Sequence, residues 1–126
     1  MTKNYKILGR YIKDMSSETP DLETYIFVRD NISKYQLNID INSKALKNKM
    51  IEVNTIMKFM DKQESKKKSY FEINYSTIIK VDDEIKEKKD LEKIILCDVQ
   101  IEIYSDLEKS LLDLLHNSGY PGVQFE

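Results

Sequence analysis

Four stretches of the chain alternate between apolar and polar residues, and this period of two is typical of strands with one buried face. We expect strands over residues 5–15, 35–42, 50–60 and 69–81. The third stretch has an apolar side formed by Ile51, Val53, Thr55, Met57 and Phe59. The fourth has a similar side formed by Phe71, Ile73, Tyr75, Thr77 and Ile79. The sequence therefore predicts a sheet with one buried face and one exposed face.

The first stretch alternates less cleanly, because Leu8 and Ile12 interrupt its polar positions. Its odd residues are expected on the buried side, namely Tyr5, Ile7, Tyr11 and Met15. Its even charged residues are expected on the exposed side, namely Lys6, Arg10 and Asp14.

Turn-forming and charged residues predict two connections between the strands. Residues 16–34 begin with Ser, Pro and Asp, which end strands, and they predict a long connection. An alternative stays open, in which residues 25–28 form a short extra strand. Residues 61–68 are highly charged and predict a solvated hairpin loop.

The period changes after Asp83, where apolar residues recur at steps of three or four and predict a long helix. These residues are Leu91, Ile94, Ile95, Val99, Ile103, Leu107, Leu111, Leu114 and Leu115. Ser105 and Glu108 resemble a capping box, so an alternative in which the helix breaks or restarts there stays open. Gly119 and Pro121 predict its end.

Strands followed by a helix predict an α+β fold, in which a four-stranded antiparallel sheet carries the long helix on one face. We expect one domain over residues 1–126. The apolar set of the helix is too wide for the sheet alone, which predicts a second partner, another subunit. We assign Ile95, Val99, Ile103 and Leu107 to that contact between subunits.

Composition excludes several classes of function. The chain has 20 basic and 22 acidic residues and a pI near 5.5, which argues against a nucleic-acid partner bound through bulk charge. A single Cys and a single His exclude an internal disulfide and a zinc site built on them. The N-terminus is polar and no apolar run reaches about 18 residues, so we expect a cytoplasmic protein. With three glycines and no catalytic constellation, we expect neither an enzyme nor a bound cofactor or metal.

One motif is distinctive. Residues 11–20 (YIKDMSSETP) resemble the Y-x-K-D-[IL]-S-F-E-x-P signature of the SecB family of protein-export chaperones. Residues 69–75 are similar to the fourth strand of that family, and residues 119–121 resemble the G-[FY]-P of the loop that joins its two helices. The resemblance covers nearly the whole chain. The chain departs from the family pattern in two places. Ser17 stands where the family has Phe, and residues 97–104 lack two prolines and a Phe of the family pattern. The second helix of the family should start soon after Phe125, so we expect a truncated or divergent member.

The resemblance implies a non-catalytic homotetramer, a dimer of dimers, that holds unfolded preproteins without ATP and delivers them to the SecA motor. Contact with the membrane would come only through SecA. The resemblance places a client groove between the crossover loop after the first strand and the loop that joins the family's two helices. Its residues here are Tyr25, Phe27, Tyr120, Val123 and Phe125. The resemblance also places a SecA-docking face on the exposed side of the sheet, formed by Asp14, Glu18, Tyr70 and Glu72. The helix would join the dimers, and an edge strand could make the dimer itself.

Other interpretations remain at this point. The groove residues could cap the edge of the core, and the acidic residues could form an ordinary solvated face. Within the same fold, the chain could be a SecB-like chaperone of a toxin–antitoxin system with one dedicated client. From a different class, it could be a non-catalytic assembly protein that only oligomerises.

Overall fold

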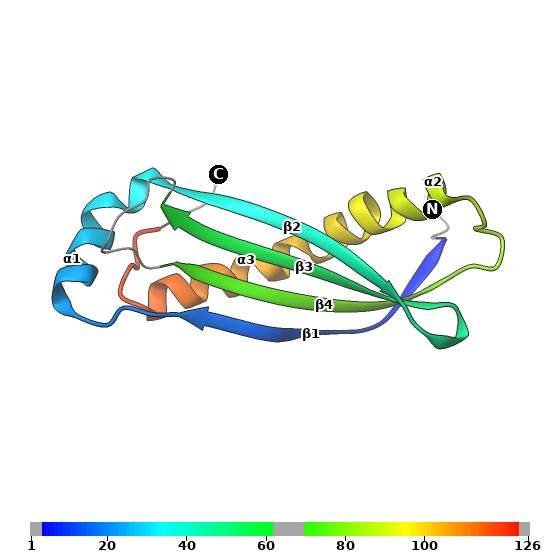
Figure 1. The fold of residues 1–126 in the computed structure, drawn as a ribbon, viewed down its shortest axis with the longest axis horizontal. Coiled ribbons are helices and arrows are strands. Elements are labelled where there is room, and N and C mark those ends of the chain that lie inside the picture. The colour runs from blue at the N-terminus through cyan, green and yellow to red at the C-terminus, as the bar shows by residue number, and fades with distance from the viewer. Residues whose placement is uncertain (1–3, 62–69, 124–126) are drawn as a thin grey trace.

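The computed structural model describes residues 4–61 and 70–123, which form one antiparallel sheet and a long helix across one of its faces (Figure 1). The elements in chain order are β1 (Tyr5–Ser17), α1 (Leu22–Asn31), β2 (Tyr35–Ala45), β3 (Met50–Asp61), β4 (Phe71–Val81), α2 (Lys88–Lys93) and α3 (Val99–Asn117). Short 3-10 turns precede β2 (Ile32–Lys34) and β3 (Lys47–Lys49). This architecture confirms the predicted α+β fold.

The sheet has the strand order β1-β4-β3-β2, and every neighbouring pair is antiparallel. The alternation predicted for β3 and β4 is confirmed, because their odd residues are buried under the helix. The fully buried apolar residues among them are Val53, Met57, Phe71, Ile73 and Ile79. Hydrophobic burial between the sheet and the helix therefore forms the core.

Strand β1 departs from the predicted alternation because its pairing with β4 shifts twice, between Ile7 and Gly9 and between Ile12 and Asp14. Each shift is a bulge, which moves the following side chains to the other face. Arg10 lies opposite Thr77 on the helix side and Tyr11 opposite Ser76 on the outer side, so the prediction was wrong for both. The second bulge restores the original phase, and Asp14 lies opposite Asn74 on the outer face as predicted.

The predicted long connection between β1 and β2 contains helix α1, so the alternative of a short extra strand over residues 25–28 was wrong. The carboxylate of Asp21 accepts a hydrogen bond from the Thr24 amide at 2.7 Å and caps the helix N-terminus. The four consecutive apolar residues 25–28 concealed the helical period. Val28 is fully buried and attaches this helix to the core.

The long helix begins at Lys88 and runs without a break past Ser105, so the alternative of a break or restart there was wrong. Its irregular turn lies earlier, over Ile94–Asp98, and has π-helical geometry. From Val99 to Leu115 every fourth residue is buried against the sheet. Within the described ranges, no helix is long and apolar enough to cross a bilayer.

Polar contacts fix the helix to the sheet as well. The Tyr5 phenol donates to the Glu102 carboxylate at 2.6 Å, and burial, followed by this contact, raises the pKa of Tyr5. The Thr55 hydroxyl donates to the side-chain oxygen of Gln100 at 3.0 Å. Arg10 forms an ion pair with Asp106 at 2.8 Å. These contacts orient the helix across the strands.

Candidate functional site

At one end of the sheet, α1 meets the turn that follows α3 through a pair of aromatic rings. The rings of Tyr25 and Tyr120 stack with centroids 5.3 Å apart and an angle of 23° between their planes. The Tyr25 phenol donates a hydrogen bond to the Gly119 carbonyl at 3.0 Å. Gly119 has a φ of +109°, and a Cβ atom there would lie 2.7 Å from the Tyr25 ring. Glycine at this position is therefore what allows the two segments to pack together.

The stack continues into the core. Tyr120 is only 4% exposed and meets Phe71 edge-on, with centroids 5.7 Å apart. Burial raises the pKa of the Tyr120 phenol. Phe71 in turn packs near Phe59, and Phe59 near Tyr35 at the start of β2. Tyr120, expected in the client groove, thus forms the buried floor of this region rather than exposed surface.

The other predicted groove residues lie at the same end of the fold. Tyr25, Phe27 and Val123 are half-buried and pack against the core, while Phe125 lies outside the described residues. Sequence reasoning missed Leu22 and Ile26, whose large apolar side chains are exposed to 70% and 38%. They are one helical turn apart and share a face of α1. Their i,i+4 spacing is present in the sequence, but the turn-forming residues at the start of the segment predicted a connection and not a helix.

The opposite face of the sheet carries most of the predicted docking face. Glu72 lies opposite Ser16, and Asp14 lies opposite Asn74. Asn74 and Glu72 are two residues apart on β4, so both carboxylates point to the side away from the helix. Tyr70 is exposed just before β4, and Glu18 follows the last residue of β1. The prediction that Asp14 and Glu72 share a face is confirmed by this register.

Basic residues interrupt the acidic surface. The Lys58 ammonium lies 3.8 Å from the Glu72 carboxylate and 5.4 Å from the centre of the Tyr70 ring. The Lys13 ammonium, beside the second bulge of β1, lies 3.6 Å from Glu52. The Ser76 hydroxyl donates to Glu52 at 2.9 Å and, together with Lys13, lowers the pKa of that carboxyl.

The residues assigned to the contact between subunits do not lie on the outer side of the helix. Ile95, Val99, Ile103 and Leu107 are all buried against the sheet, so this prediction was wrong. Their i,i+4 spacing marked the face of the helix that fills the core. The solvent side of the same helix instead exposes Leu96, Ile101 and Tyr104, and Ile101 is 78% exposed. Exposed apolar side chains also follow β1, namely Leu8, Tyr11, Ile12 and Met15.

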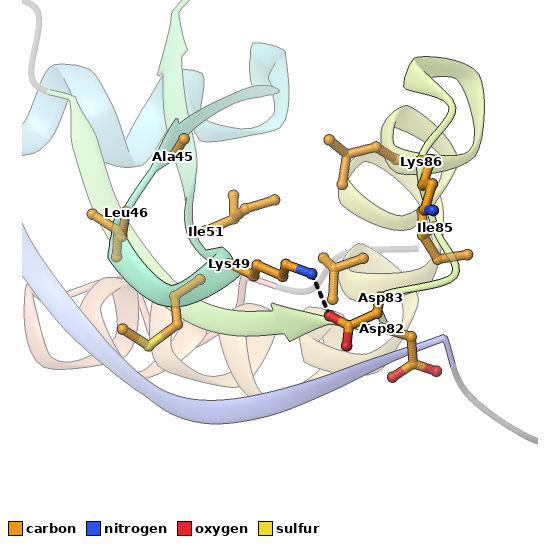
Figure 2. Close-up of a pocket in the computed structure, with 11 residues that line it drawn as sticks. Ala45, Leu46, Lys49, Ile51, Asp82, Asp83, Ile85 and Lys86 are labelled. Carbon is orange, nitrogen blue, oxygen red and sulfur yellow. Dashed lines mark hydrogen bonds and ion pairs between the residues drawn. The ribbon is translucent and has the colours of Figure 1, made fainter.

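An apolar pocket of about 340 Å³ lies at the other end of the sheet, between the β2–β3 turn and the segment that leads into α2 (Figure 2). Its apolar lining includes Leu46, Ile51 and Ile85. The Lys49 ammonium and the Asp83 carboxylate, 2.6 Å apart, join its two sides, and this contact lowers the pKa of Asp83 (Figure 2). Among the described residues, no group of three or more His, Cys, Asp and Glu side chains could hold a metal ion.

Comparison with known proteins gives one consistent result. The family model for the preprotein translocase subunit SecB matches residues 1–126. A protein-export protein SecB of Pelagibacter ubique (strain HTCC1062) is 66% identical over 126 residues, which are 100% of this chain and 90% of that protein.

Two solved structures share the fold at 10% identity. One is a SecB-like chaperone of Mycobacterium tuberculosis in complex with an antitoxin peptide, with a TM-score of 0.69 over 98% of this chain and 90% of that one. The other is a Streptococcus agalactiae protein of unknown function, with a TM-score of 0.57 over 97% and 96%. The family match and the close relative settle the classification: the chain belongs to the SecB family of non-catalytic chaperones and is not an enzyme.

Proposed function

We propose that this SecB family member is a cytoplasmic, ATP-independent export chaperone that holds unfolded preproteins and delivers them to the SecA motor. The observation that carries the proposal is the exposure of Leu22 and Ile26 beside the Tyr25–Tyr120 stack. Exposed apolar side chains on a rigid, aromatic base suit the binding of many unfolded chains, because apolar contact does not depend on one sequence. The client groove in this proposal comprises Leu22, Tyr25, Ile26, Phe27 and Val123, with Tyr120 beneath them and Phe125 as a further expected member.

Delivery to SecA would use the docking face of Asp14, Glu18, Tyr70 and Glu72. This face lies on the outer side of the sheet, whereas the client groove lies where α1 meets the turn after α3. A client and SecA could therefore be bound at the same time. Carboxylates on a solvated face mainly speed encounter with a basic partner and set its orientation.

The assembly that we propose is a homotetramer, a dimer of dimers. Isolated apolar residues on a surface need no explanation, but here two rows of them lie on neighbouring elements. We assign the apolar row of β1 to the dimer and the exposed residues Leu96, Ile101 and Tyr104 to the contact between dimers.

The proposal is tested by adding the protein, without ATP, to a slowly folding preprotein diluted from denaturant. Light scattering from aggregates should fall when the chaperone is in several-fold excess. Unchanged scattering would count against a holding function, and a strict need for ATP would count against the mechanism proposed here.

Delivery is tested separately by measuring SecA binding to Glu72→Lys. Binding should weaken, and more so at low salt, because charge attraction is screened as ionic strength rises. Glu92→Lys on α2 is the matched control, since it makes the same charge change away from the docking face. Equal binding by the two variants would contradict the docking face. A pull-down that recovered a single antitoxin, with no affinity for SecA, would instead support the toxin–antitoxin interpretation.

A further inference from the structure

The free edge of β2 is the most regular stretch of exposed backbone in the described sheet. We propose that an extended segment of an unfolded client pairs with this edge and becomes a fifth strand of the sheet. The inference rests on the proposed function, because it takes the client of a holding chaperone as the occupant.

The edge is continuous and correctly oriented for pairing. Strand β2 pairs with β3 without a shift, from Tyr35 opposite Asp61 to Ala45 opposite Ile51. The Leu46 amide donates to the Met50 carbonyl at 2.8 Å, which makes the even residues of β2 the hydrogen-bonded partners of β3. The odd residues therefore direct their N–H and C=O groups away from the sheet, and these are Leu37, Ile39, Ile41 and Ser43.

This edge lacks most of the features that normally prevent strand addition. Such edges are protected by proline, bulges or rows of charged side chains. Strand β2 has no proline, no register shift and only two charged residues, Asp40 and Lys44. Within the described part of the chain, no other strand lies beside it.

The two edges of the sheet differ in a way that separates a client from a second copy of the chain. Strand β1, at the other edge, is bulged twice and exposes large apolar residues on both faces, which suits a permanent subunit contact. The outer side of β2 is polar: Gln36, Asn38 and Asn42 are uncharged, and Asp40 and Lys44 carry opposite charges. A polar edge of this kind suits a partner that must also be released.

The surroundings of β2 favour a polypeptide with scattered apolar residues. The strand begins at Tyr35, whose ring packs near Phe59 below the client groove. It ends at Ala45, which lines the apolar pocket (Figure 2). Its 11 residues would span about 36 Å at about 3.3 Å per residue. Side chains of an added strand could reach the groove at one end and the pocket at the other. Main-chain pairing between them would depend little on client sequence, because every client has the same backbone.

Amide hydrogen exchange tests the pairing directly. The probe is an unstructured peptide of about twelve residues with alternating Leu and Ser, about the length of β2 at strand spacing. When it is bound, the amides of Leu37, Ile39, Ile41 and Ser43 should exchange at least about tenfold more slowly, because they gain hydrogen bonds. The even residues Asn38, Asp40 and Asn42 serve as internal controls, since β3 already protects them.

The outcomes separate the proposals. A peptide that binds without slowing these four amides would overturn strand addition and leave the proposed function intact. A chaperone that neither binds the peptide nor suppresses aggregation would overturn both. Protection of the four amides without peptide, increasing with protein concentration, would identify a second copy as the occupant and also overturn the inference.

Two matched reagents give an independent test. In an added strand, every second amide of the peptide faces β2 and the amides between them face away. N-methylation of the set that faces β2 should therefore abolish binding, while N-methylation of the other set should not. In the protein, Ser43→Pro removes one outward N–H and should weaken peptide binding about threefold to tenfold relative to Ser43→Ala. Equal binding of the two methylated peptides would overturn the inference. Ser43→Pro is used only if circular dichroism shows an unchanged fold, and the peptide pair carries the test otherwise.

Discussion

The Tyr25 phenol donates a hydrogen bond to the Gly119 main-chain carbonyl at 3.0 Å, and this contact joins segments 94 residues apart in the sequence. One segment is the helix between β1 and β2, and the other is the turn that ends α3. The stacked ring of Tyr120 extends the contact into the core. Because the proposed client groove lies on these two segments, their packing decides whether the groove exists.

Gly119→Ala is therefore expected to disrupt the groove and lower stability. The substitution places a methyl group 2.7 Å from the Tyr25 ring, at a φ of +109° that residues with a side chain rarely adopt. We expect the free energy of unfolding to fall by about 1–3 kcal/mol, measured by urea denaturation. We also expect weaker client binding, since α1 must move away from the turn.

Gly122→Ala is the matched control, because a Cβ atom there would meet nothing within 4 Å. It should change stability by less than about 0.5 kcal/mol. Adding Tyr25→Ala to the Gly119 variant should cost less stability than the sum of the two single changes, because it removes the clash. If Gly119→Ala and Gly122→Ala were equally stable, the close approach of α1 to the turn would be contradicted.

The sequence predicted the regular elements well because burial imposes a simple period on them. Val53, Met57 and Phe71 alternate with polar neighbours, and the structure buries all three. Strand β1 was harder to predict because its bulges leave no mark in the pattern: Arg10 and Tyr11 exchange faces although Asp14 does not. A bulge depends on pairing with β4, which is information that a single segment does not contain.

The candidate site was only partly predictable for a related reason. The motif around Asp14 identified the family, but not the helical state of α1 that exposes Leu22 and Ile26. The apolar stripe of the long helix showed that one face was buried, but not against what. Ile103 and Leu107 were assigned to another subunit, whereas they meet the sheet of their own chain.

Leu22→Ser combined with Ile26→Ser should weaken client binding more than it lowers stability. Leu22 is 70% exposed, so its loss removes little buried area from the folded chain, whereas Ile26 is 38% exposed and its loss removes somewhat more. At about 1 kcal/mol for each apolar side chain that a client covers, the double variant should bind about thirtyfold more weakly. Titration of an unfolded, fluorescently labelled polypeptide measures the affinity. Asp30→Ser, an exposed polar change on the same helix, should leave it unaltered.

If the double variant bound clients normally, Leu22 and Ile26 would not belong to the groove. If it bound weakly but also lost several kcal/mol of stability, these residues would support the fold instead, as an assembly protein with no client would require. Urea denaturation of the same samples separates the two results.

Ile101→Glu should break the proposed tetramer into dimers. Ile101 is exposed on the solvent side of α3, near Leu96 and Tyr104 of the same surface. In a contact between dimers, burying an unpaired carboxylate at this position would cost several kcal/mol. Because the assembly is symmetric, every copy of the chain would bring the same carboxylate into the contact. Light scattering coupled to size exclusion measures the mass. Lys89→Glu, at the start of the helix, is expected to remain tetrameric, and a tetrameric Ile101→Glu variant would place the contact elsewhere.

Glu52→Gln should lower stability at neutral pH and make stability less sensitive to acid. The hydrogen bond from Ser76 and the charge of Lys13 hold the pKa of Glu52 below its ordinary value of 4.5. A carboxyl with a lowered folded pKa stabilises the fold above the unfolded pKa, and this contribution is lost as pH falls through the folded value. The variant should therefore be about 1–2 kcal/mol less stable than the native chain at pH 7. The difference should shrink steadily below pH 4.5. Urea denaturation across this range measures it, with Glu92→Gln on α2 as the control. A difference that stayed constant with pH would show that Glu52 acts through packing rather than through its charge.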